Sequence, residues 1–256
     1  MRRRPRAAVE VVERRVTVAG RPVRYGVAGA GDPVVLIHGL AGSWRWWRPS
    51  IPALAEHYLV HLVDLPGFGL TRRGQRFVLG EAADWLLEWM RAIDLEAVHL
   101  VGHSMGGYIA VHLAAAAPEA VRRLVLVAPA GTEHGRTMLG YGLPLLVTVC
   151  HLAPSFLPVL ARDALRSGPV TVWRAARQLL GGDLSESLQR VTVPTLLIWG
   201  AHDRLVPPVI GRGLRAAMPC ARLLIIEGAG HVPMYERPRE FDAAVLAFFA
   251  GQPVGE

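Results

Sequence analysis

The chain has 256 residues, of which 52% are hydrophobic and 19% charged, and this composition excludes an intrinsically disordered protein. Its 28 basic side chains are all arginine and outnumber 21 acidic ones, which gives a net charge of +7. Apart from a cluster at 2–6, the arginines are scattered or paired, as at Arg72–Arg73, and no basic stripe interleaved with aromatic residues accompanies them. We therefore expect no nucleic-acid partner. The length suits one large domain with a small insertion.

The amino-terminal segment does not predict a secretory signal. Arginines occupy most of 2–6, but the following stretch 7–16 is interrupted by Glu10 and other charges, so no apolar core of signal length follows. Cys150 and Cys220 are too isolated for a disulfide framework or a metal site. We expect a cytoplasmic protein with no metal and no cofactor.

Strands and helices are predicted to alternate along the first half of the chain. Runs that are β-branched, alternating or continuously apolar predict strands at 9–18, 22–27, 33–37, 58–63, 98–101 and 124–127. Helical spacing of apolar residues predicts helices near 47–56, 81–93 and 105–116.

The alternation stops between residues 131 and 190, where no strand is predicted. From 138 to 161 there is no Asp, Glu or Arg, and the length would suit a membrane span. Five glycines and prolines interrupt it, and His151 lies in its middle, so we expect short packed helices instead. Alternation resumes with strands at 195–199 and 222–226 and helices at 208–217 and 239–249.

This pattern predicts an α/β fold. Eight strands with helices between them indicate a mostly parallel sheet covered by helices on both faces. The strandless segment is then a small helical cap inserted after the sixth strand. We expect a core made of residues 1–130 and 191–256, with a cap at 131–190.

The stretch 100–110 carries the pattern Gly-X-Ser-X-Gly between a buried strand and a helix. Ser104 would stand on a strained strand-to-helix turn, where Gly102 and Gly106 avoid collisions by lacking a β-carbon. Five residues with three fixed positions are a weak signal alone. The alternative is an ordinary glycine-rich turn with a solvated serine.

Polar residues follow the ends of several predicted strands: His38, Asp64, Ser104, Asp203 and His231. Functional groups of open α/β sheets collect at the carboxyl ends of the strands. A nucleophilic serine needs a base, and an acid that orients the base. Asp203 and His231 are placed for these tasks, with Asp64 and Glu133 as alternative acids.

Five motifs in this order resemble those of the α/β-hydrolases, a family that includes carboxylesterases, cofactor-free haloperoxidases and carbon–carbon-bond hydrolases. The motifs are His38–Gly39, Asp64–Gly69, Gly102–Gly106, Trp199–Asp203 and Gly228–Pro233. The resemblance covers nearly the whole chain outside the cap. It implies an α/β-hydrolase fold with Ser104 as nucleophile, His231 as general base and then acid, and Asp203 as the orienting carboxylate.

The resemblance also implies an oxyanion hole. The backbone N–H groups of Met105 and Leu40 would bind the developing negative charge on the carbonyl oxygen, and Ala41 is the alternative to Leu40. His38 is expected to brace this loop.

We expect the substrate pocket to be lined by residues near the serine and from the cap: His38, Trp44, His103, Leu139, Tyr141, Leu145 and Val232. An alternative for Trp44 and the tryptophans after it is packing of the first helix on the sheet. Placed over Ser104, the charge-free stretch would favour neutral, lipophilic acyl groups over charged ones.

These expectations predict a carboxylesterase that cleaves a small lipophilic ester through an acyl-enzyme. A serine at the elbow argues against the dehalogenase and epoxide-hydrolase branches, which attack through a carboxylate. Ring-cleavage hydrolases usually carry an aromatic residue directly after the catalytic histidine, and Val232 at this position argues against them. Hydrolysis of a vinylogous diketone is kept as the alternative. A non-catalytic small-molecule receptor is the alternative from another class. We expect weak lipid contact through the cap at most, without stable membrane insertion.

Overall fold

The computed structural model describes residues 9–71, 76–131, 140 and 142–256, and its eight strands form one sheet. The strand order is β1-β2-β4-β3-β5-β6-β7-β8. β2 pairs antiparallel with β1 and β4, and the other neighbouring pairs are parallel. The bounds are β1 Val12–Val18, β2 Arg21–Ala28, β3 Asp32–Ile37, β4 Tyr58–Val63, β5 Val98–His103, β6 Val121–Val127, β7 Thr195–Gly200 and β8 Ala221–Ile226. The predicted mostly parallel, eight-stranded sheet is confirmed.

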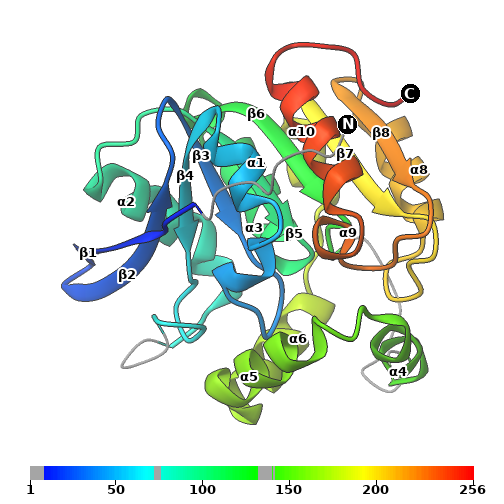
Figure 1. The fold of residues 1–256 in the computed structure, drawn as a ribbon, viewed down its shortest axis with the longest axis horizontal. Coiled ribbons are helices and arrows are strands. Elements are labelled where there is room, and N and C mark those ends of the chain that lie inside the picture. Colours follow the sequence, from blue (N-terminus) through cyan, green and yellow to red (C-terminus); the bar gives the residue numbers. More distant parts are fainter. Residues whose placement is uncertain (1–8, 72–75, 132–139, 141) are drawn as a thin grey trace, which may run out of the picture.

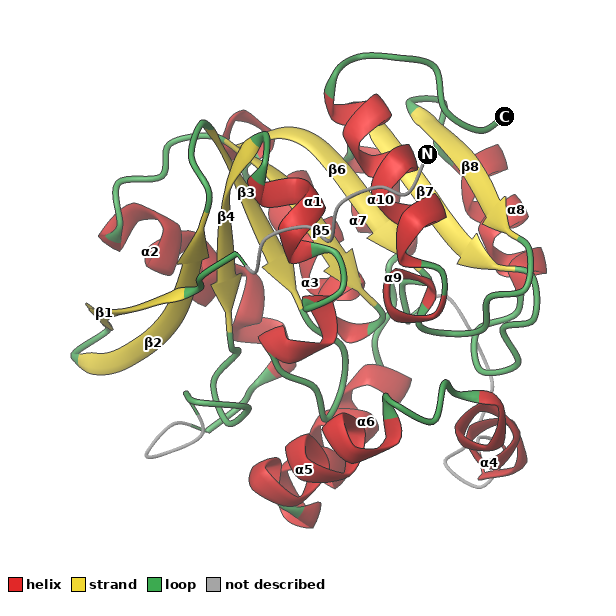
Figure 2. Cartoon of the chain, viewed as in Figure 1, coloured by secondary structure: helices red, strands yellow, loops and turns green. Residues whose placement is uncertain are grey.

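Helices cover both faces of this sheet (Figure 2). One face packs against α2 Ala82–Ala92, α3 Met105–Ala116, α7 Ser185–Arg190 and α8 Pro208–Ala217. The other packs against α1 Ile51–Ala55, α9 Pro233–Glu236 and α10 Pro238–Phe249. The remaining elements are α4 Gly142–His151, α5 Leu157–Ser167, α6 Pro169–Leu180 and the 3₁₀ turns η1 Trp44–Trp47, η2 Leu79–Glu81 and η3 Pro118–Ala120.

The central strands are apolar because helices bury them from both sides. β5 and β7 are buried along their whole length, and the last four residues of β3 are fully buried. The edge strand β1 is mostly exposed and carries Glu13, Arg14 and Arg15, charges that discourage pairing with another chain.

One predicted helix differs from the structure. The segment 47–56 divides into η1 and the five-residue helix α1. Pro49 and Pro52 supply no N–H group to a helical ladder, so a continuous helix cannot form across them.

The sheet topology places a crevice beside β3 and β5. From β3 the order runs to β4 on one side, whereas from β5 it runs to β6 on the other. The loops that leave β3 and β5 therefore diverge at the carboxyl edge of the sheet, where α/β folds bind ligands. Figure 1 shows α4, α5 and α6 gathered at this edge, while α7 packs against α3.

The charge-free stretch does not form a single span. Its described part contributes α4 and the start of α5, with a break at 152–156 between them. Among the residues that the structure describes, no helix has the length and apolar character needed to cross a membrane.

Candidate active site

Ser104 occupies a strained turn between β5 and α3. Its φ of 52° and ψ of −113° are uncommon for a residue with a side chain. The turn is held by main-chain bonds: Ser104 N–H donates to Val127 O at 2.9 Å, and Ser104 O accepts from Tyr108 N–H at 3.0 Å and Ala130 N–H at 3.2 Å. The surrounding structure thus maintains the strain, and it presents this serine at the carboxyl edge of the sheet.

The two glycines of the elbow permit this close packing. A β-carbon at Gly102 would collide with the carbonyl oxygen of Gly106, and one at Gly106 would lie 2.5 Å from Ile37 O. Strand β3, strand β5 and helix α3 therefore approach one another more closely than any other residue would allow.

Asp203 and His231 form a buried pair on the loops after β7 and β8. His231 Nδ1 lies 2.8 Å from Asp203 Oδ2, and the other carboxylate oxygen accepts the N–H groups of Leu205 and Val206, each at 2.9 Å. The side chains are 7% and 0% exposed. Since the carboxylate accepts, Nδ1 donates, and neutral His231 then carries an unprotonated Nε2 able to take a proton.

His103 connects the elbow to the histidine loop. Its Nε2–H donates to His231 O at 2.8 Å, and the two rings lie 4.9 Å apart. On the other side of the ring, Nδ1 packs against Gly39. A β-carbon at Gly39 would lie only 2.8 Å from this nitrogen. Burial, with the neighbouring His231, holds the pKa of His103 well below its usual value. Neutral His103 thus brings together the loops that carry Ser104, His231 and Leu40.

His38 braces the loop after β3, as expected. Its Nδ1–H donates to Gly39 O at 2.8 Å, and its Nε2 accepts from Leu65 N–H at 3.1 Å. Complete burial lowers the pKa of His38 from 6.5 to about 4, so the ring is neutral and both nitrogens are engaged by main-chain groups. The turn that follows is closed by a bond from Gly42 N–H to Gly39 O at 3.1 Å, with Ala41 at a φ of 59°.

Asp64 anchors the far end of this loop. Its carboxylate accepts Trp44 N–H at 2.7 Å and Leu70 N–H at 2.8 Å. Burial raises the pKa of Asp64 from 3.8 to about 6, although these two bonds act to lower it. Both oxygens are occupied by the main chain, so Asp64 serves the loop, and Asp203 is the carboxylate that contacts His231. The other alternative acid, Glu133, lies outside the described residues.

Two further side chains hold the site, and sequence reasoning missed both. Asp163 of α5 is fully buried and accepts from the hydroxyl of Ser43 at 2.6 Å, directly after the Gly39–Gly42 turn. Glu236 accepts Gly230 N–H at 2.5 Å beside His231, and burial raises the pKa of Glu236. For Asp163 the sequence offered one signal of a special role, since it is the single acidic residue between 142 and 180. For Glu236 there was none.

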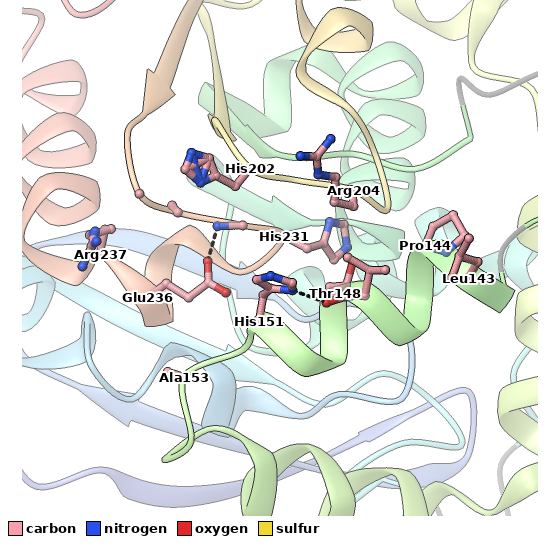
Figure 3. A pocket seen from close by; sticks show the side chains of 14 residues that line it. Leu143, Pro144, Thr148, His151, Ala153, His202, Arg204, His231, Glu236 and Arg237 are labelled. Atoms are coloured by element: carbon pink, nitrogen blue, oxygen red, sulfur yellow. Dashed lines mark hydrogen bonds between the residues drawn. The ribbon is translucent and has the colours of Figure 1, made fainter.

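A cavity of about 850 Å³ lies beside His231, between α4 and the loops after β7 and β8. Leu143, Val147 and His151 of α4 line one side, and His202 lines the other. Figure 3 shows His231 between these two walls. The cavity therefore combines an apolar helix surface with polar loop residues at the general-base candidate.

The predicted pocket residues have other surroundings. His38, Trp44, His103, Leu145 and Val232 do not line this cavity. The two histidines are fully buried by the contacts described above, and Val232 is buried as well. The indole of Trp44 packs under the guanidinium groups of Arg45 and Arg48, while Leu145 is 51% exposed. Leu139 and Tyr141 lie outside the described residues.

We expect the free energy of unfolding to fall as the pH is lowered from 6.5 to about 4, in part through His38. In the unfolded chain His38 has its ordinary pKa of 6.5, whereas in the folded protein the pKa of His38 is about 4. Between these pH values the unfolded state binds the additional proton. The contribution of neutral His38 to the free energy of unfolding is therefore fully present above pH 6.5. It is lost between pH 6.5 and about 4, and the loss is on the order of 3 kcal/mol.

Urea unfolding at several pH values, for the wild type and His38→Gln, measures this effect. The variant should be less stable at neutral pH and should lose less stability on acidification. Asp64, whose raised pKa acts in the opposite direction, is common to both proteins and cancels in the comparison. Parallel pH dependences would contradict the assignment.

Residues 32–148 and 158–238 match the family described as alpha/beta hydrolase fold. The pimeloyl-[acyl-carrier protein] methyl ester esterase of Aeromonas hydrophila is 31% identical over 254 residues, covering 87% of this chain and 97% of that protein. A crystal structure of a bacterial membrane phospholipase A has a TM-score of 0.82 and 29% identity, and covers 94% of this chain and 86% of that one. The structure of a meta-cleavage product hydrolase from Pseudomonas fluorescens has a TM-score of 0.76 and 26% identity, and covers 93% of this chain and 97% of that one.

Proposed function

The chain belongs to the α/β-hydrolase fold family, and from that premise we propose that it is a serine hydrolase that cleaves carboxylic esters through an acyl-enzyme. Hydrolase chemistry follows from the family and from relatives that include an esterase. The choice of esters, and the roles of individual residues, are our proposal. The observation that carries it is the Asp203–His231 pair at 2.8 Å, joined through His103 to the elbow that bears Ser104.

In the first half of the proposed reaction, His231 Nε2 takes the proton from Ser104 Oγ as the oxygen attacks the ester carbonyl. The negative charge that develops on the carbonyl oxygen is bound by the backbone N–H groups of Met105 and Leu40. The tetrahedral intermediate then collapses, the carbon–oxygen bond to the alcohol breaks, and His231 returns its proton to the departing alcohol.

In the second half, water takes the place of the alcohol. His231 removes a proton from the water, which attacks the acyl-enzyme, and then protonates Ser104 Oγ as the acid leaves. Asp203 keeps Nδ1–H oriented throughout and stabilises the imidazolium. The side chains that anchor the loop after β3, namely His38 within it, Asp64 after β4 and Asp163 on α5, support a hole that is formed before the charge develops.

We propose that residues 131–190 act as a cap and that the substrates are neutral and lipophilic. Leu143 and Val147 of α4 supply apolar surface to the cavity at His231. Against the α4 wall an uncharged acyl or alcohol chain is favoured, because a charged one would lose hydration beside Leu143 and Val147, whereas Arg204 and Arg237 line the loop side of the cavity.

A fluorophosphonate probe tests the chemistry directly, since it reacts only with an activated serine. We expect one label per chain, located by mass spectrometry in the peptide between Arg91 and Arg122, which contains Ser104. A panel of p-nitrophenyl esters of increasing acyl length should be turned over with a preference for apolar chains. Absence of both label and turnover would favour the non-catalytic receptor.

A second candidate is hydrolysis of a carbon–carbon bond in a vinylogous diketone. The structural similarity to a meta-cleavage product hydrolase supports it. Turnover of a ring-cleavage product, followed by the loss of its visible absorbance, distinguishes the two. Faster turnover of that compound than of every ester would replace the first candidate with the second.

A further inference from the structure

The helices α4, α5 and α6 expose an unusual number of apolar side chains. Seven large apolar residues of this segment are at least 39% exposed: Leu143, Leu145, Leu146, Leu157, Leu165, Val170 and Trp173. In the rest of the described chain, only Val12 and Val209 fall in this class. Figure 1 shows the three helices at the same edge of the molecule. We call the exposed side of these helices the α4–α6 face.

Helix α5 departs from an ordinary surface helix at two positions, although Val159 and Leu160 pack against the core in the usual way. Its acid, Asp163, is completely buried against Ser43, whereas Leu165 is 82% exposed. Surface helices normally turn charged residues outward and apolar residues inward. Helix α4 is similar in effect, because it carries no acidic residue or arginine and none of its residues is buried. Burial of the folded core therefore does not account for these apolar side chains.

The exposed charges of this face have one sign. Arg162, Arg174 and Arg177 are exposed, and the guanidinium of Arg177 lies 5.7 Å from the centre of the Trp173 ring. Asp163 is the single acidic residue between 142 and 180, and its burial removes it from the surface. The face thus combines aliphatic side chains, a tryptophan and arginines without an exposed carboxylate.

We propose that the α4–α6 face docks on the surface of an anionic lipid bilayer. Aliphatic and tryptophan side chains enter the boundary between headgroups and acyl chains, while arginines extend to the phosphates. A second copy of this chain fits poorly, because pairing two such faces would bring arginines against arginines. The attraction of arginine for an anionic membrane, by contrast, adds to that of the apolar residues.

The same face adjoins the cavity at His231. Leu143 is 70% exposed and also lines the cavity, so α4 borders both the docking face and the proposed active site. A lipophilic ester could therefore pass from the membrane to the site along α4. This link rests on the proposed function, whereas membrane binding itself does not.

Flotation of the full chain with vesicles tests the docking. One set of vesicles contains phosphatidylcholine alone, and the other an equimolar mixture with phosphatidylglycerol. The double variant Leu165→Asp/Trp173→Asp should lose binding to the anionic vesicles. The matched control Val209→Asp changes an apolar residue that is 66% exposed on α8 and should bind like the wild type.

A second pair of variants tests the charge. Arg174→Gln/Arg177→Gln should weaken binding to anionic vesicles by about fivefold per arginine, and high salt should reduce binding of the wild type. Arg91→Gln/Arg212→Gln removes the same net charge from α2 and α8, where both arginines are exposed, and should have little effect. Ser104→Ala should bind vesicles normally, which separates docking from catalysis.

Three results would overturn the proposal. The first is no binding of the wild type to either kind of vesicle, and the second is equal binding to neutral and anionic vesicles. The third is a dimer in solution that Leu165→Asp/Trp173→Asp dissociates, because that result would assign the face to a second copy of the chain. Circular dichroism checks that each variant is folded, and turnover of a water-soluble ester adds a second check for every variant except Ser104→Ala.

Discussion

Ser104→Ala should lower kcat for p-nitrophenyl esters by on the order of 10⁴- to 10⁶-fold, the range expected when a triad nucleophile is removed. Alanine keeps the β-carbon of Ser104, so it meets the same φ of 52° and the same neighbours as serine. The elbow should therefore keep its shape and lose only the hydroxyl that attacks the ester. The measurement is steady-state turnover, together with a thermal unfolding curve to establish that the fold is retained.

Ser155→Ala is a suitable control for this experiment. Ser155 is exposed in the turn between α4 and α5, and the contact it makes with Tyr235 uses its main-chain oxygen. The control should retain wild-type turnover and wild-type labelling by the fluorophosphonate. Equal activity of Ser104→Ala and the wild type would exclude the acyl-enzyme mechanism at this serine.

Asp203→Asn should lower kcat by on the order of 10⁴-fold, as the corresponding change does in the triad of serine proteases. Two N–H groups, from Leu205 and Val206, point at Asp203 Oδ1. The amide oxygen of asparagine would stay with these donors, which turns the amide NH₂ toward His231 Nδ1. That nitrogen would then accept a hydrogen bond, and the proton of neutral His231 would move to Nε2. In this tautomer His231 cannot accept the serine proton.

Asp64→Asn provides the comparison, because Asp64 was the alternative acid. Its two oxygens accept main-chain N–H groups of Trp44 and Leu70, so an amide NH₂ would face a donor and destabilise the loop. We expect a lower melting temperature and a much smaller loss of kcat than for Asp203→Asn. A larger loss for Asp64→Asn than for Asp203→Asn would transfer the role of orienting acid to Asp64.

The sheet and its helices were predictable because they depend on local patterns. Runs such as 33–37 and 195–199 are apolar at every position, which suits strands buried on both faces. Boundaries were less accurate where polar residues extend a strand. Strand β6 begins at Val121 and not at 124, and the exposed Arg122 within it pairs with Asp32 at 2.8 Å. A local hydropathy pattern does not reveal such a partner 90 residues away.

The candidate site was predictable to the extent that it depends on motifs. Asp203 and His231 follow strands, and parallel strands bring their carboxyl ends to one edge, so their meeting follows from the topology. The pocket was not predictable in the same way. His103 was expected at the pocket wall, but its side chain points to His231 O, a contact between residues 128 positions apart.

The sequence by itself therefore determined the order of strands and helices, the strained elbow at Ser104 and the residues available for acid–base chemistry. These follow from the periodicity of side chains and from glycines at fixed positions. Only the tertiary structure decided that Asp163 turns inward to Ser43 while Leu165 turns outward, and that α4 borders the cavity at His231. Such directions depend on how a helix is rotated against the core, and contacts made across more than a hundred residues determine that rotation.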